Sequence, residues 1–182
     1  AALDNFLSEE KKTLLQKALE LIELPPDQLA QLRLSTIHGD ANDHNVLVNA
    51  QGEPGAFALI DWGDMVYSWL VADPAIAVTY ILIAVRSRGP TGMQQSARAF
   101  LTGYMEELPL NETERACFGY LVISRLAQSV AMSSSEQAAN IGNAAYTSVH
   151  SMGAWETLEY LVNLPGDQLQ AMFHVDMSLE SQ

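Results

Sequence analysis

The stretch IHGDANDHNVLV, residues 37–48, crowds two acids, two histidines and two asparagines against the start of an apolar segment. Residues 45–62, NVLVNAQGEPGAFALIDW, hold two apolar segments around a connection rich in glycine and proline, which predicts a β-hairpin with a loop of moderate length. A second polar group, DWGD at residues 61–64, follows the second strand. Because hairpin strands run in opposite directions, we expect both polar groups at the same end of the hairpin.

The order of these polar residues indicates a particular chemistry. Asp40 is followed by Asn45 and, beyond the hairpin, by Asp61 at the start of an Asp-x-Gly sequence. Kinase-type phosphoryl transfer uses an Asp that accepts or orients the substrate hydroxyl proton, then an Asn and an Asp that hold Mg²⁺ on ATP. Hard oxygen ligands suit that ion. Either motif alone is a common turn or helix cap, whereas the two together predict phosphoryl transfer that depends on ATP and Mg²⁺.

The same segments carry a family resemblance. IHGDANDHNVLV, followed by LIDWGDMVYSWLVADPAIA at residues 59–77, resembles the aminoglycoside phosphotransferase and choline kinase-like superfamily, in which HGD replaces the HRD of protein kinases. The closer likeness is to hydroxylysine kinase-like proteins and to kinase domains fused to class III aminotransferases. It rests on NDHN, on DWGDM in place of the usual DFGDM, and on LVISRLAQSVAMS at residues 121–133. The resemblance implies that Asp40 is the catalytic base and that Asn45 and Asp61 are the metal ligands.

The sequence leaves several neighbouring roles open. Asp64 follows the glycine of the second motif, and a second metal site, a helix cap and a hydrogen-bonding role are all compatible with it. Asp43 and His44 are candidates for substrate contact, although loop residues exposed to solvent are common. For His38 we expect structural hydrogen bonds behind the loop rather than a role as base. Asp73 is a candidate N-cap for the next helix, and the resemblance implies that it ties the loops together.

Arg125 stands out because it lies in an otherwise apolar segment, where a guanidinium needs an anionic partner or a path to solvent. In the hydroxylysine kinase-like group, an arginine here is a candidate for binding the carboxylate of an amino-acid substrate, since its planar fork matches that group. A buried salt bridge to a structural acid is the more ordinary alternative.

The rest of the chain is patterned mainly for helices. A brief strand is expected at LSTIHGD, and Asn111 with Glu114 is spaced like a capping box. Helical spacing of apolar residues predicts helices at 8–24, with Ser8 as cap, and at 73–85, 91–107, 111–133 and 136–163, with a short one after 166. We therefore expect an α+β fold, mainly α-helical: the C-terminal lobe of a protein-kinase-like fold over residues 1–182, with a small β-hairpin carrying the catalytic and metal loops.

A nucleotide-clamping N-terminal lobe is not recognisable. Such a lobe supplies a glycine-rich turn over the phosphates and a strand lysine held by a glutamate. Residues 1–36 contain one predicted helix, with Lys11, Lys12 and Lys17 on its polar side, and no glycine. We therefore expect a missing N-terminal lobe as partner, and expect this chain alone to bind ATP poorly and to turn over little.

Composition limits the classes of partner. With 182 residues and 48% hydrophobic content the chain can form one packed domain, and no apolar run approaches the roughly 20 residues of a membrane span. A formal net charge of −13 disfavours nucleic acid and favours cationic small molecules or divalent metal ions. The single cysteine, Cys117, excludes an internal disulfide and favours a reducing, cytoplasmic location.

Two classes of function fit these observations. In the first, the chain phosphorylates a hydroxyl of a small amine-bearing substrate, with a hydroxylysine-like amino acid as first choice and aminoglycosides, choline or homoserine as alternatives. In the second, it is a non-catalytic kinase-like module fused to an aminotransferase. A module without catalysis has no chemical need for Asp40, Asn45 and Asp61 together, which favours the enzyme.

Overall fold

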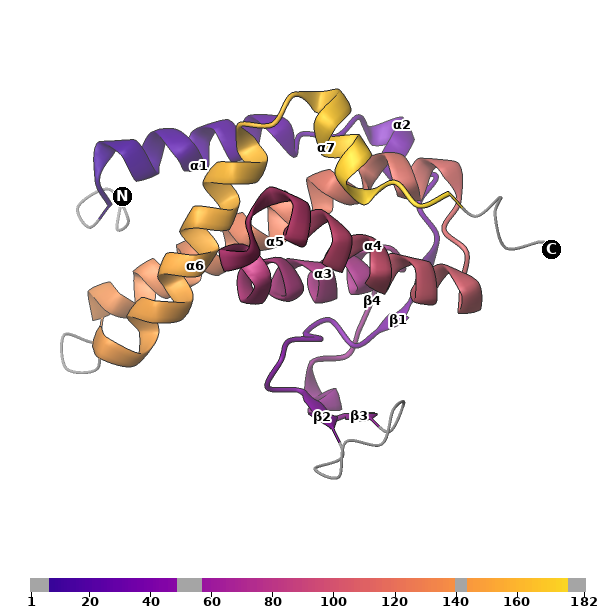
Figure 1. Ribbon diagram of the computed structural model, residues 1–182, viewed down its shortest axis with the longest axis horizontal. Coiled ribbons are helices and arrows are strands. Elements are labelled where there is room, and N and C mark those ends of the chain that lie inside the picture. The colour runs from indigo at the N-terminus through magenta and orange to yellow at the C-terminus, as the bar shows by residue number, and fades with distance from the viewer. Residues whose placement is uncertain (1–6, 49–56, 140–143, 177–182) are drawn as a thin grey trace.

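The computed structural model describes residues 7–48, 57–139 and 144–176, and shows a helical body with short strands on one side (Figure 1). The helices are α1 (Glu9–Leu21), α2 (Pro26–Leu29), α3 (Ala72–Val85), α4 (Gly89–Glu107), α5 (Glu112–Ala139), α6 (Ala144–Val162) and α7 (Gly166–Phe173). The strands are β1 (Leu34–Ile37), β2 (Val46–Val48), β3 (Phe57–Leu59) and β4 (Val66–Trp69), and short 3-10 turns cover Trp62–Asp64 and Arg86–Arg88. The expected mainly helical α+β class is confirmed.

Side-chain caps set the starts of two helices as the sequence predicts. Ser8 accepts a hydrogen bond from the backbone N–H of Lys11 at 3.4 Å and begins α1. At α5, Asn111 Oδ1 accepts from Glu114 N at 2.8 Å, and Glu114 Oε2 accepts from Asn111 N at 2.8 Å, which confirms the capping box. Among the described helices, none is long and apolar enough to cross a membrane.

Several helix boundaries differ from expectation, and α6 begins at Ala144 rather than at residue 136. The predicted break between residues 133 and 136 is absent, because α5 continues to Ala139. Ser133 and Ser134 donate their hydroxyl protons back to the carbonyl of Val130, at 3.2 and 2.6 Å, so these serines are accommodated within the helix rather than ending it. The N-cap of α3 is Val71, not Asp73, and the carboxylate of Asp73 has other partners.

The strands form two antiparallel pairs. The predicted hairpin pairs β2 with β3, from Val46 opposite Leu59 to Val48 opposite Phe57, and its loop at 49–56 lies outside the described residues. The predicted strand β1 pairs with β4, with Ile37 opposite Val66, and this partner was not predicted from the sequence. The two pairs therefore bracket both polar segments, and residues 38–45 meet residues 60–65 between them (Figure 1).

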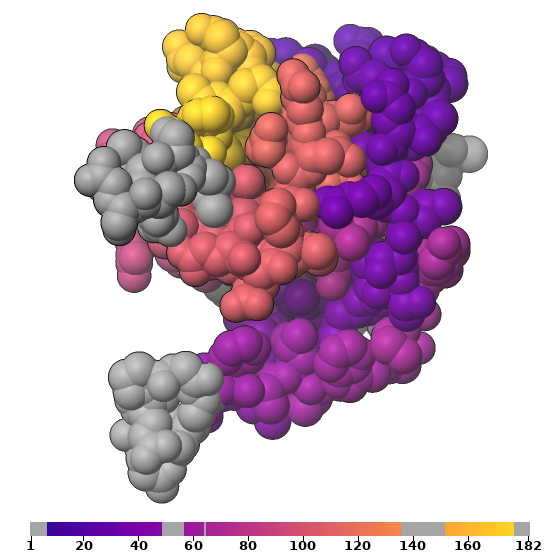
Figure 2. Space-filling view, turned by 90° about the vertical axis from the view of Figure 1, so that its right-hand side faces the viewer, coloured from indigo at the N-terminus to yellow at the C-terminus, as the bar shows by residue number. Residues whose placement is uncertain are grey.

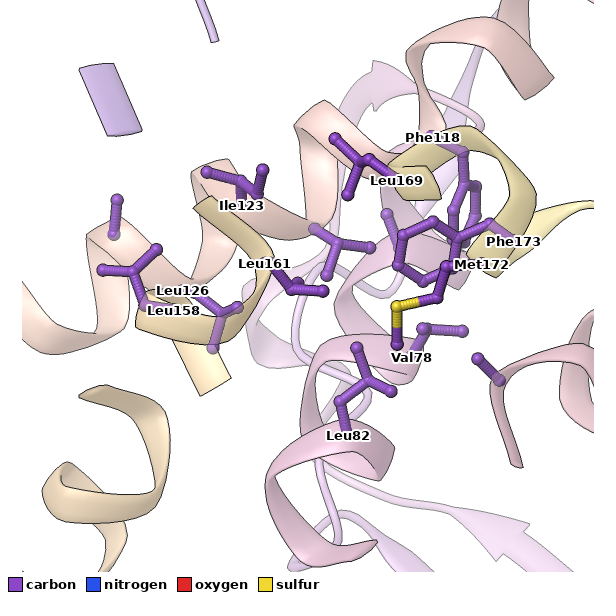
Figure 3. Close-up of a cluster of buried hydrophobic side chains, with 14 of the residues drawn as sticks. Val78, Leu82, Phe118, Ile123, Leu126, Leu158, Leu161, Leu169, Met172 and Phe173 are labelled. Carbon is purple, nitrogen blue, oxygen red and sulfur yellow. The ribbon is translucent and has the colours of Figure 1, made fainter. Parts of the chain in front are cut away.

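The core centres on α5, which packs against α1, α3, α6 and α7. Figure 3 shows side chains from α3, α5, α6 and α7 meeting there, including Leu82, Phe118, Leu158 and Phe173. The rings of Phe118 and Phe173 lie with centroids 5.4 Å apart. Cys117 is buried in this core as expected, and burial raises the pKa of its thiol. The packing fixes α5, and with it Arg125, relative to α3.

A buried ion pair joins the strands to the start of α5. Glu114 is fully buried, and its carboxylate accepts hydrogen bonds from Arg33 Nε at 2.8 Å and Arg33 Nη2 at 2.6 Å, as well as from Arg33 N at 3.3 Å. Burial by itself would raise the pKa of Glu114, but the hydrogen bonds from Arg33 and from the Asn111 backbone outweigh it, and the pKa is lowered. Arg33 directly precedes β1, so this pair anchors the strand that leads into the first polar loop.

Candidate active site

The backbones of the two polar loops are joined and take special conformations. Ile60 N donates to Asn45 O at 3.0 Å, which links the end of one loop to the start of the other. Gly39 has a φ of 81°, which glycine adopts without strain. Asp61 takes the left-handed conformation, with φ 63° and ψ 57°, which Asp adopts more readily than most residues that carry a side chain.

Both carboxylate oxygens of Asp40 are engaged. Oδ1 accepts from Arg125 Nη2 at 2.6 Å. Oδ2 accepts from the side-chain amides of Asn42 at 2.8 Å and of Asn45 at 3.2 Å. A quarter of the Asp40 side chain is exposed. The candidate base is therefore held in one orientation and remains reachable from solvent.

Asn45 presents an oxygen that can serve as a metal ligand. Its Nδ2 donates to both the backbone carbonyl of Asp40, at 2.9 Å, and the Asp40 carboxylate, so its Oδ1 is left for another partner. Asp61 lies just beyond the backbone bond that joins the loops and is exposed. Within the described residues, no three His, Cys, Asp or Glu side chains gather as a metal site. The available donors are thus an amide oxygen and a carboxylate, a set that fits Mg²⁺ carrying phosphate and water ligands.

His38 supports the loop from behind, as expected. It is buried, its Nδ1 accepts from Asp40 N at 3.3 Å, and its Nε2 lies 2.9 Å from the carbonyl of Ile60. A ring protonated at Nε2 satisfies both contacts. The ring also packs edge-on against Trp62, with centroids 5.0 Å apart, so His38 touches both polar loops.

Asp73 holds the turn that carries Asp40. Its Oδ1 accepts from Gly39 N at 3.0 Å and its Oδ2 from His38 N at 3.4 Å. The tie to the loops implied by the family resemblance is therefore present. The expectation of a helix cap is wrong because the carboxylate is turned toward the loop.

Arg125 pairs with the candidate base itself. The salt bridge foreseen as its more ordinary role is present, but its acid is Asp40 rather than a separate structural residue. Arg125 Nη2 also donates to the hydroxyl of Tyr80 at 2.8 Å. Tyr80 was not predicted from the sequence as a site residue. Its phenol hydroxyl in the otherwise apolar α3 was the signal that could have identified it.

The remaining predicted residues lie around the same loop. Asn42 Oδ1 accepts from His44 N at 2.8 Å and from Asn45 N at 3.2 Å, which shapes the turn. His44 and Asp43 are exposed on it. Asp64 belongs to the 3-10 turn after Asp61, and its side chain lies outside what the structure describes.

A pocket of about 510 Å³ opens beside the loop, between the hairpin, α3 and α4. Figure 2 shows the strand segment projecting from the helical body with a hollow beside it. The walls are mainly apolar and include Val46, Phe57, Pro74, Ile81 and Phe100, while Asn42, Asp43, Asp73, Tyr80 and Tyr104 supply polar groups. Burial, reinforced by Asp73, raises the pKa of Tyr104 to about 12.

Comparison with known proteins places this sequence in a family. The sequence model of the phosphotransferase enzyme family (APH) matches residues 2–110. The hydroxylysine kinase of Mus musculus is 29% identical over 162 residues, covering 85% of this chain and 42% of that protein. That of Xenopus laevis is 25% identical over 183 residues, covering 94% of this chain and 48% of that protein. The chain spans less than half the length of the curated relatives it matches, and no solved structure matches it.

Proposed function

This chain belongs to the phosphotransferase enzyme family, and we propose that it is the catalytic lobe of an ATP-dependent kinase for small molecules. The acceptor is a hydroxyl of an amine-bearing substrate, a hydroxylysine-like amino acid above all. The observation that carries the proposal is the junction of the two loops, where Asn45 bonds both Asp40 and the residue before Asp61. Relatives named hydroxylysine kinase support the choice of substrate.

Each residue of this junction has a task in the transfer. Asp40 accepts the proton of the substrate hydroxyl as its oxygen attacks the γ-phosphorus, or orients that hydroxyl. Asn45 Oδ1 and the Asp61 carboxylate hold Mg²⁺, which when bound neutralises charge on the ATP phosphates. His38 and Asp73 keep the loop in place through the bonds described above. The chain's own contribution is positioning, which phosphoryl transfer requires most.

The surroundings of the loop suit an amine on an alkyl chain. The pocket beside Asp43 is apolar over most of its wall, and acids and tyrosine hydroxyls supply its polar groups. The formal net charge of −13 also favours a cationic ligand. Aminoglycosides, choline and homoserine remain the competing substrates within the superfamily.

A further lobe is part of the proposal, because ATP needs groups that the described residues do not offer. Large apolar side chains are exposed along the strands, with Val48 at 75%, Phe57 at 69% and Tyr67 at 69% exposure. Exposed apolar surface of this kind marks an interaction site. An N-terminal lobe packed on these strands would cover it and close the nucleotide site.

The test is a phosphorylation assay on the full gene product that contains this chain. With ATP, Mg²⁺ and 5-hydroxylysine we expect ADP release and a phosphorylated product detected by mass spectrometry. Asp40→Asn should lower kcat by roughly 10²- to 10⁴-fold with folding retained. Asp61→Asn should lower activity and raise the Mg²⁺ concentration required. Asp27→Asn, an exposed position in α2, is the matched control and should behave as wild type.

Parallel reactions with aminoglycosides, choline and homoserine identify the acceptor. Phosphorylation of one of these instead of hydroxylysine would overturn the proposed substrate and leave the proposed kinase activity standing. Equal activity in Asp40→Asn and wild type would overturn the assigned site.

A further inference from the structure

Arg125 is tied to the proposed base and is not saturated with partners. One nitrogen, Nη2, serves both the Asp40 carboxylate and the Tyr80 hydroxyl, while Nη1 donates to Gln128 at 3.3 Å. The guanidinium carbon lies 5.5 Å from the centroid of the Tyr80 ring. Nε is buried and finds no acceptor among the described residues. The guanidinium therefore has donors to spare for a second anion.

The ion pair occupies the oxygen of Asp40 that a substrate needs. Two side-chain amides hold Oδ2 and fix the direction of the carboxylate. Oδ1 is the other oxygen, and Arg125 covers it at 2.6 Å. While the guanidinium lies there, it occupies one lone pair of Oδ1 and crowds the approach of a substrate hydroxyl to the other. Arg125 must move or share its contact before Asp40 can receive a proton.

Moving Arg125 away without a replacement is unfavourable. Its side chain is 18% exposed and that of Asp40 is 25% exposed, so separation leaves two mostly buried charges without an opposite charge beside them. A carboxylate on the substrate removes this penalty, because it gives the guanidinium an equivalent anion in the bidentate geometry that arginine prefers. An amine or a neutral group on the substrate cannot do the same.

From these contacts we infer that the substrate's carboxylate binds Arg125 in place of Asp40 and thereby frees Asp40 for catalysis. This inference rests on the proposed kinase function and adds a requirement to it. The freed Oδ1 then accepts the hydroxyl proton while the hydroxyl oxygen bonds to the γ-phosphorus. The bond from that phosphorus to the bridging oxygen breaks, and ADP leaves with its electron pair. Arg125 is thus a specificity-determining residue that favours amino-acid substrates over choline and aminoglycosides, which lack a carboxylate.

The experiment compares 5-hydroxylysine with its carboxamide, which has the same hydroxyl and amines but no carboxylate. The full gene product is assayed as wild type and as Arg125→Gln, with kcat and KM measured separately. In wild type we expect the carboxamide to lose at least about tenfold in kcat, the scale of one charged hydrogen bond. In Arg125→Gln, Asp40 is no longer covered by the guanidinium. We therefore expect a higher kcat for the carboxamide than in wild type, and no preference for 5-hydroxylysine over its carboxamide. Arg86→Gln, which breaks an ion pair to Glu156 away from the loop, should keep the wild-type preference.

The outcomes separate the inference from the proposed function. If Arg125→Gln lowers kcat equally for both substrates, or leaves kcat for the carboxamide unchanged, the proposed exchange of partners at Arg125 is overturned. The kinase assignment then stands. A wild type that treats both substrates alike has the same meaning. If no hydroxylysine compound is phosphorylated in a manner sensitive to Asp40→Asn, the proposed function falls, and the exchange falls with it.

Discussion

Replacement of Glu114 by alanine should strongly destabilise the protein, because this buried carboxylate joins the entry to β1 to the cap of α5. Glu114 is fully buried and accepts from Arg33 Nε, Arg33 Nη2 and the backbone of both Arg33 and Asn111. Removing one partner of a buried pair costs about 3–5 kcal/mol. The Arg33 side chain is 42% exposed and can regain water, so we expect the lower end, about 3 kcal/mol.

Thermal and urea unfolding followed by circular dichroism measure this loss. For a chain of this length, about 3 kcal/mol corresponds to a decrease in Tm of roughly 6–12 °C. Glu156→Ala is the matched control, since it also removes a glutamate from an arginine pair, but at a side chain that is 55% exposed. That variant should lose at most about 1 kcal/mol. Equal losses in the two variants would refute the reasoning that burial makes the Arg33 pair important.

The pH dependence of the free energy of unfolding provides a second test of the same ion pair. The pKa of Glu114 is lowered from its usual 4.5, so the folded state favours the charged carboxylate. A group with a depressed folded pKa stabilises the protein above its unfolded pKa, and the contribution is lost as the pH falls through the folded value. The difference in unfolding free energy between wild type and Glu114→Ala should therefore be full above about pH 5 and shrink at lower pH. A difference that stays constant into the acid range would contradict the assigned ion pair.

Two further predictions concern the supports of the site. Asp73→Ala removes the acceptor of the backbone N–H groups of His38 and Gly39, so we expect a loss of about 2 kcal/mol and faster hydrogen exchange at both amides; unchanged protection would rule out the tie. Tyr104 should ionise well above the ordinary tyrosine value in an ultraviolet titration, because burial and Asp73 raise its pKa to about 12, and Tyr104→Phe should remove that step. Since the pKa of Tyr104 is raised in the folded state, the protonated phenol contributes to the free energy of unfolding. This contribution is full below the ordinary tyrosine value of 10.0 and is lost as the pH rises toward about 12. A Tyr104 that ionises at the ordinary value of 10.0 would show that the pocket wall is open to water.

Local patterns carried much of the fold. The capping box at Asn111 and Glu114, the cap at Ser8 and the hairpin around 49–56 involve residues close in the chain, and each was predictable because short-range geometry dictates it. The order of Asp40, Asn45 and Asp61 was readable for the same reason, since phosphoryl transfer requires particular groups in sequence along two loops. Where local signals were weak, as at the serines near residue 134, the predicted break was wrong.

Contacts between distant segments were decided by the tertiary structure. Sequence alone identified Arg125 as needing an anion, yet 85 residues separate it from Asp40. The two meet because α5 packs against α3 across the core, while β1 pairs with a strand that the sequence did not reveal. Asp73 likewise turned from a helix cap into a loop support once His38 and Gly39 came within reach. The sequence by itself determined which chemical groups are present and their local geometry; the packing of the whole core determined which of them touch, because a side chain's partner depends on every helix and strand that positions it.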